Sequence, residues 1–196
     1  MPRTRSASAH KKVLQAALEL AAQRGFDATS MDAVALKSGV SKATIYNHWS
    51  DKEALMLELM AELNGLRDRP SFDSGNTRCD MIAVLSYRSS ENAEMRERIL
   101  PHFMAFAGTH PKVGMAWRQM VAEPPRRELT RLIQLGMQKG EFRPKLDIEF
   151  CLALLLGPMV YWHIFLLRST EDPKPLAESV IDVFWRAYGV TRKTRP

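Results

Sequence analysis

The stretch that decides the fold is TSMDAVALKSGVSKATIYNHWSDKEAL, which runs from Thr29 to Leu55. It carries signals for three short helices in succession. Thr29 and Asp32 have the spacing of a capping box, which predicts a helix that begins near Ser30. Gly39 follows the apolar residues of this helix and can adopt the left-handed conformation that ends it. The chain is therefore expected to turn at this glycine.

Two further helices are predicted after the turn. Ser41 is a suitable N-cap for a helix over residues 42–48, and Ser50 with Glu53 repeats the capping-box spacing for a third helix. The third helix has apolar residues at helical spacing up to Leu63, which predicts one buried face. Two helices joined by a tight turn and packed with a third form a helix-turn-helix unit.

The helix over 42–48 has a polar surface typical of a helix that lies against DNA. Hydrogen-bond donors and an aromatic ring gather on it: Lys42, Thr44, Tyr46, Asn47 and His48. The apolar residues around it are expected to face inward: Val40, Ala43, Ile45 and Trp49. The second helix of this motif enters the major groove, with its N-terminal residues at base edges and its neighbours on phosphates. The sequence therefore predicts DNA binding.

This stretch resembles the DNA-binding domain of the tetracycline-repressor (TetR) family of bacterial transcriptional regulators. The family pattern is matched in order by Thr29, Val34-Ala35, Ser38-Gly39-Val40-Ser41, Ala43-Thr44-Ile45-Tyr46, His48-Trp49 and Lys52-Glu53. The chain departs from the pattern in three places: Ser38 for Ala, Ala43 for Gly and Trp49 for Phe. The resemblance implies phosphate contacts by Thr29, Thr44, Tyr46, His48 and Lys52. It also implies that the residues nearest the bases are Lys42, Ala43 and Asn47.

A first helix is predicted upstream, beginning near Val13 and ending at Gly25. The segment before it has no acidic residue and is expected to be a disordered, basic arm that carries Arg3, Arg5, Lys11 and Lys12. Two interpretations remain open for this arm. It is either a solvated tail or a segment that contacts the minor groove or the phosphates of DNA.

Composition agrees with a globular, DNA-binding chain. Its 196 residues are 45% hydrophobic and 26% charged, so the chain can form a core. A net charge of +6 and a pI of about 9.5 suit a polyanionic partner. Cys79 and Cys151 are isolated and lack metal-ligand spacing, and no signal peptide begins the chain. A cytoplasmic location is therefore expected, with no metal and no cofactor.

No pattern typical of an enzyme is present. The sequence has no glycine-rich phosphate loop, no metal-spaced cluster of His, Cys and Glu, and no nucleophile elbow. We therefore expect no catalytic residues. The alternative to a regulator is a helical interaction protein without a small-molecule effector, whose helix-turn-helix either docks onto another protein or coats DNA without sequence preference.

The remainder of the chain is helical in pattern. A polar loop over 66–75 precedes five or six helices without a strand, and Pro124 with Pro125 is expected to interrupt them. The predicted fold is all-α with about nine helices. Residues 1–55 form a DNA-binding helix-turn-helix domain, and residues 56–196 form a helical domain for effector binding and dimerisation. The second domain resembles the family's C-terminal domain only loosely, around residues 126–127, 140–142 and 156–158.

The most apolar run, residues 150–167, poses a choice between a membrane and an interface. It barely reaches spanning length and contains Gly157, Pro158 and His163, so no membrane contact is expected. A helix that is apolar all round is buried, here by its own core and by a second copy of the chain. Together with the helix over 177–188, it predicts a homodimer whose recognition helices read a palindromic DNA operator.

A ligand pocket is the final prediction. Large, soft and aromatic side chains are its candidate lining: Phe103, Met104, Trp117, Met120, Met159, Trp162 and His163. Ordinary core packing is the other explanation of the same residues. The sequence as a whole predicts a transcriptional regulator. We expect a repressor that leaves its operator when a small apolar effector binds. An activator is the alternative within this class.

Overall fold

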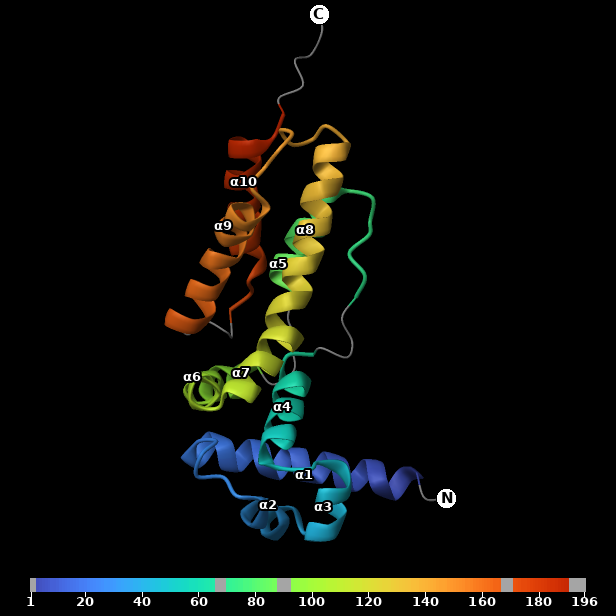
Figure 1. Cartoon of the computed structure of the whole chain (residues 1–196), viewed down its shortest axis with the longest axis vertical. Coiled ribbons are helices and arrows are strands. Elements are labelled where there is room, and N and C mark those ends of the chain that lie inside the picture. The colour runs from blue at the N-terminus through green and yellow to red at the C-terminus, as the bar shows by residue number, and fades with distance from the viewer. Residues whose placement is uncertain (1–2, 66–69, 88–92, 167–170, 191–196) are drawn as a thin grey trace, which may run out of the picture. The chain divides into compact units, whose positions relative to one another are not determined.

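The structure, a computed structural model, describes residues 3–65, 70–87, 93–166 and 171–190 (Figure 1). Within these ranges the only pairing of β type is an isolated bridge between Phe142 and Gly189. The helices are α1 (Arg3–Arg24), α2 (Met31–Ser38), α3 (Lys42–His48), α4 (Lys52–Leu63), α5 (Thr77–Ser86), α6 (Ala93–Thr109), α7 (Pro111–Trp117), α8 (Glu123–Gln138), α9 (Ile148–Val160) and α10 (Lys174–Tyr188). A π-helical segment links α7 to α8 without a loop, and another continues α9. The predicted all-α fold is confirmed.

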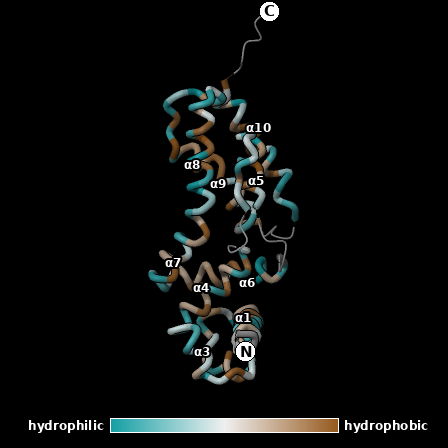
Figure 2. Tube along the Cα trace, turned by 90° about the vertical axis from the view of Figure 1, so that its right-hand side faces the viewer, coloured by the Kyte–Doolittle hydropathy of each residue, from teal (hydrophilic) through white to brown (hydrophobic). Residues whose placement is uncertain are grey.

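These helices form two compact units. The first unit contains α1 to α4 with α6 and α7, and the second contains α5, α8, α9 and α10. Hydrophilic and hydrophobic residues alternate along most of the helical trace, as expected where each helix buries one face (Figure 2). The predicted boundary at residue 55, between a DNA-binding domain and an effector-binding and dimerisation domain, stays a prediction.

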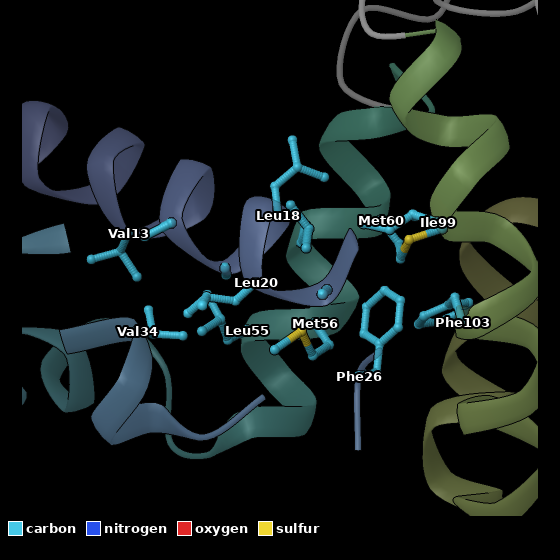
Figure 3. Close-up of a cluster of buried hydrophobic side chains, with 14 of the residues drawn as sticks. Val13, Leu18, Leu20, Phe26, Val34, Leu55, Met56, Met60, Ile99 and Phe103 are labelled. Atoms are coloured by element: carbon cyan, nitrogen blue, oxygen red, sulfur yellow. The ribbon is translucent and has the colours of Figure 1, made fainter. Parts of the chain in front are cut away.

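The core of the first unit joins the three helices of the DNA-binding motif to α1 and α6. Side chains from α1, α2, α4 and α6 point toward one another in it (Figure 3). Phe26, just beyond α1, lies with its ring centroid 5.2 Å from that of Phe103 and 5.7 Å from that of Phe106. Val34 and Leu55 are fully buried in the same cluster. This shared core fixes the frame on which α3 is held.

The helix starts in the first unit differ from prediction in three places. Ser30, not Thr29, caps α2, because its hydroxyl accepts from the backbone N–H of Ala33 at 3.2 Å. Asp51, not Ser50, caps α4. The prediction of a disordered N-terminal arm is also wrong, because α1 begins at Arg3 and includes the basic segment.

The second unit has its own core. Phe142 lies edge-on to Phe184, with centroids 5.5 Å apart, and to Trp185, with centroids 4.6 Å apart. Pro124 and Pro125 do not interrupt the chain, as had been expected, but occupy the first turn of α8. They lie directly after the π-helical segment over residues 118–122, where the hydrogen bonding departs from the α-helical pattern that a proline ring disrupts.

Gly136→Ala is expected to destabilise the second unit by about 1–3 kcal/mol. Gly136 is buried in α8, and a β-carbon there would overlap two ring carbons of Phe142, whose ring Phe184 and Trp185 hold in place. Gly108→Ala is the matched control. Gly108 lies in α6 with nothing within 4 Å of an added β-carbon, so the change should be neutral or stabilising by up to about 1 kcal/mol. Thermal unfolding measures both, and an unchanged midpoint for Gly136→Ala would contradict this packing.

Candidate DNA-binding site

The recognition helix predicted from the sequence, α3, is held at both ends and in the middle. At its start, the Ser41 hydroxyl accepts from the backbone N–H of Thr44 at 3.2 Å. Ile45 is its one buried residue, with an exposed fraction of 1%. Trp49, which follows the last residue, is 2% exposed. The other side chains of α3 are exposed or, at Thr44, half-buried.

The outer face of α3 gathers most of the predicted DNA contacts. The exposed residues are Lys42, Ala43, Tyr46, Asn47 and His48, and Thr44 is half-buried. Ala43 therefore does not face inward as its apolar side chain had suggested. The helix presents donors, an aromatic ring and one small residue on a single surface, which is the chemistry that base edges and phosphates require.

Asp32 shapes the start of this face. Its carboxylate lies 2.7 Å from the ammonium of Lys42, and both side chains are more than half exposed. The pair links the first turn of α2 to the first residue of α3. An exposed pair of this kind contributes little to stability, but it directs where the Lys42 ammonium points.

Two predicted phosphate contacts are engaged inside the protein. Thr29 is fully buried, and its hydroxyl donates to the carbonyl of Gly25 at 2.8 Å. A contact between this side chain and DNA would require the turn to open. The Lys52 ammonium donates to the carbonyls of Phe26 and Asp27, at 3.3 and 3.1 Å, and lies 5.3 Å from the ring centroid of Phe106. Both residues hold the turn after α1, while their contact with DNA stays a prediction.

The predicted ligand-binding residues are divided between the two units. Phe103, Met104, Trp117 and Met120 belong to the first unit, and Met159, Trp162 and His163 to the second. Phe103 is fully buried, with its ring centroid 4.7 Å from that of Trp117, whereas Met104 is 40% exposed. None of the seven lines either of the two cavities found in the described residues. A ligand pocket at these residues stays a prediction.

Two cavities in the second unit lie along α10. One, of about 590 Å³, has a mixed polar and apolar lining formed by Arg78, Asp182, Trp185, Arg186, Gly189 and Val190. An apolar one of about 330 Å³ lies between α9 and α10 and is lined by Leu154, Pro158, Ser179, Val180, Val183, Phe184, Ala187 and Tyr188. We call the second one the α9–α10 groove.

Comparison with known proteins decides the family. Residues 13–59 match the model of the tetR family of bacterial regulatory proteins, and residues 72–184 match the tetracyclin repressor-like C-terminal domain. The chain belongs to the TetR family. It is thus a DNA-binding transcriptional regulator built from a helix-turn-helix domain and a helical C-terminal domain, as the resemblance implied.

Relatives agree with this assignment over most of the chain. The HTH-type transcriptional regulator YdeS of Bacillus subtilis is 32% identical over 81% of this chain and 80% of its own length. The DNA-binding transcriptional repressor TetR of Mycobacteroides abscessus is 27% identical over 92% of both. A TetR-family regulator structure from Mesorhizobium loti superposes with a TM-score of 0.62 at 26% identity, over 95% of this chain and 99% of that one.

Regulators of this family are not enzymes, which agrees with the sequence. Burial, aided by the charge of Asp147, raises the pKa of the Cys151 thiol, so this cysteine stays protonated. Across the described ranges no cluster of three or more His, Cys, Asp or Glu side chains could hold a metal ion. None of the helices described has both the length and the apolar character needed to cross a bilayer.

One residue at the site was missed by sequence reasoning. Glu58 lies on α4 among buried apolar neighbours, and its carboxylate contacts both His10 and Trp49. Its place between Leu55 and Leu59 on an otherwise apolar stretch is the only sequence signal that could have indicated it.

Proposed function

We propose that the chain is a homodimeric repressor that binds a palindromic operator through α3 and leaves it when an apolar effector binds. The observation that carries the DNA-binding part is the outward face of α3, where donors stand exposed on a helix fixed at both ends. The relative from Mycobacteroides abscessus, whose name describes a DNA-binding repressor, supports repression. A cytoplasmic location is part of this proposal, because the DNA that the protein would bind lies there.

The proposal of a dimer is supported by the α9–α10 groove and by exposed apolar side chains around it. Large apolar side chains stand exposed along these two helices and the segment after α9: Phe150, Leu154, Val160, Tyr161, Phe165 and Val183. Exposed apolar side chains gathered in this way support an interface with a second copy of the chain. Leu155 and Phe184, which the apolar pattern alone also favours for the interface, are 0% and 3% exposed in the core of the second unit. They therefore stabilise the protomer itself.

Two-fold symmetry determines the DNA site. In a C2 dimer the same helices meet from both protomers, so the α9–α10 groove packs against its own copy. The two copies of α3 then read two half-sites about one helical turn, or about 10 base pairs, apart. A palindromic operator follows from this symmetry.

Effector release requires that the effector bind one state of the dimer better than the other. The coupling between ligand and operator cannot exceed that difference in affinity. The candidate residues Phe103, Trp117 and Met120 are apolar and polarizable, which favours a hydrophobic, aromatic effector over an anionic one. Such a ligand should both stabilise the folded protein and weaken operator binding.

Trp117→Ala is expected to reduce the response to the effector by about tenfold in ligand concentration while leaving operator affinity unchanged. The indole is half-buried at the edge of the first unit's core, where it packs on Phe103, and Ile45 is the one residue of α3 buried in that core. A library of apolar and anionic compounds is first screened by thermal shift and by release of labelled operator DNA. Hits are then titrated against the wild type, Trp117→Ala and the conservative Trp117→Phe. If no apolar compound gives both effects, or if Trp117→Ala responds like the wild type, these residues are ordinary core.

A further inference from the structure

A single carboxylate on α4 contacts α1 and the residue that follows α3. Glu58 on α4 accepts a hydrogen bond from the indole N–H of Trp49, with 2.6 Å between Nε1 and Oε2. Its other oxygen, Oε1, lies 3.0 Å from Nε2 of His10 on α1. Glu58 therefore links Trp49, which follows α3, to α4 and to α1.

Aromatic contacts close the same cluster. The ring of His10 is stacked on that of Trp49, with centroids 4.8 Å apart and planes 26° apart. The ring of His48, the last residue of α3, meets the His10 ring edge-on at 5.6 Å. We call His10, His48, Trp49 and Glu58 the α3 clamp. The side chains of His10 and Glu58 are each 24% exposed and Trp49 is 2% exposed, so these three residues are largely shielded from water, whereas His48 is exposed.

Because α3 is short, the clamp at its end has a large effect on its direction. The helix has seven residues and buries only Ile45 along its length, so its direction depends on how its two ends are fixed. Ser41 fixes the start and Trp49 fixes the end. A small tilt about Ile45 would displace the exposed donors relative to the base edges. Base contacts are more sensitive to such a shift than phosphate contacts, because they depend on the direction of each hydrogen bond.

Trp49 differs from the usual phenylalanine of the family pattern in having an indole N–H that can donate a hydrogen bond. Phenylalanine, the usual residue of the family pattern at this place, could fill the same space but could not donate to Glu58. A buried indole N–H is costly unless it is paired, and a hydrogen bond to a charged acceptor is stronger than one between neutral groups. The hydrogen bond therefore constrains the ring as well as filling the space.

We propose that Glu58 is a positioning residue for DNA recognition: by holding the Trp49 indole against His10, it fixes the direction of α3 and so sets how well the protein distinguishes its operator from other DNA. This inference rests on the proposed role of α3 as the recognition helix. Glu58 itself does not touch DNA. It acts through Trp49, so its removal changes discrimination more than overall attraction to DNA.

The test compares affinity for the selected operator with affinity for random DNA at one salt concentration. Trp49→Phe removes only the donor, and Glu58→Met removes the acceptors while keeping the length of the side chain. Each is expected to lower the ratio of operator to random affinity about threefold to tenfold, with affinity for random DNA unchanged. Glu58→Gln should restore most of the ratio, since its amide oxygen can still accept from the indole. The double variant Trp49→Phe with Glu58→Met should lose no more than Glu58→Met alone, because Glu58→Met already removes the hydrogen bond that Trp49→Phe breaks.

Controls separate positioning from folding. Glu94→Met removes a carboxylate from an exposed position on α6 in the same unit and should leave the ratio unchanged. Melting temperatures identify variants that are merely unstable, and Trp49→Phe, a conservative change, keeps the test available if Glu58→Met folds poorly. A wild type that discriminates, with Trp49→Phe and Glu58→Met discriminating equally well, overturns the positioning role alone. A wild type without discrimination overturns the proposed function and this inference with it.

Discussion

Val183→Glu is expected to convert the protein into a folded monomer whose operator affinity is lower by about a hundredfold or more. Val183 is 65% exposed on α10 and lines the α9–α10 groove with Leu154 and Pro158. In the proposed dimer the partner copy covers this side chain. An unpaired charge buried there costs about 3–5 kcal/mol, and a monomer can bind only one half-site at a time.

The outcome is read by light scattering at micromolar concentration, thermal unfolding and titration of operator DNA. Gln134→Glu is the matched control, because it adds the same charge at an exposed position on α8. It should remain dimeric with operator affinity close to that of the wild type. If Val183→Glu dimerises as tightly as the control, the groove is not the interface. A monomeric wild type would refute the dimer altogether.

Ala43→Glu is expected to lower affinity for all DNA by about a hundredfold or more without loss of stability. Ala43 is exposed at the second position of α3, beside Lys42 and Asn47. A glutamate there adds a negative charge where the proposed complex brings phosphates and base edges close. It also adds bulk at the point of nearest approach. Because the residue is exposed and glutamate is a good helix former, the protein should unfold at nearly the same temperature.

Gln23→Glu is the control for charge alone. Gln23 is exposed near the end of α1 in the same unit, so the change alters net charge equally without touching α3. Filter-binding titrations at several salt concentrations should show a small, uniform loss for Gln23→Glu. An equal loss for both variants would mean that Ala43 lies outside the DNA interface.

Local signals in the sequence were enough to place the DNA-binding helices. Gly39 adopts the left-handed conformation expected of it, with φ of 68°, and α3 spans the predicted residues. Where prediction failed by one residue, two neighbouring side chains could each have capped the helix. Ser30 and Asp51 have that role because their oxygens, rather than those of Thr29 and Ser50, reach the free N–H groups. Sequence spacing alone does not distinguish such neighbours.

Contacts between distant residues were the part that the sequence could not supply. Lys52 lies against carbonyls 25 and 26 residues earlier in the chain, and Glu58 joins His10, 48 residues away. No periodic pattern encodes these pairs, because they depend on how helices pack. For the candidate ligand residues, the sequence likewise could not distinguish a pocket from a core. Phe103 is apolar and large, which suits a pocket and a core equally, and it lies in the core of the first unit.

Selection of preferred DNA from a random pool tests most directly whether α3 reads an operator. The wild type, Lys42→Ala, Asn47→Ala and Tyr46→Ala are carried through the same selection. The wild type should enrich a two-fold symmetric sequence with half-sites about 10 base pairs apart. Lys42→Ala and Asn47→Ala should change the preferred bases at matching positions in both half-sites, whereas Tyr46→Ala should keep the sequence and bind it more weakly. No enriched sequence for the wild type, or the same sequence for the Lys42 and Asn47 variants, would contradict the assignment of α3 as the recognition helix.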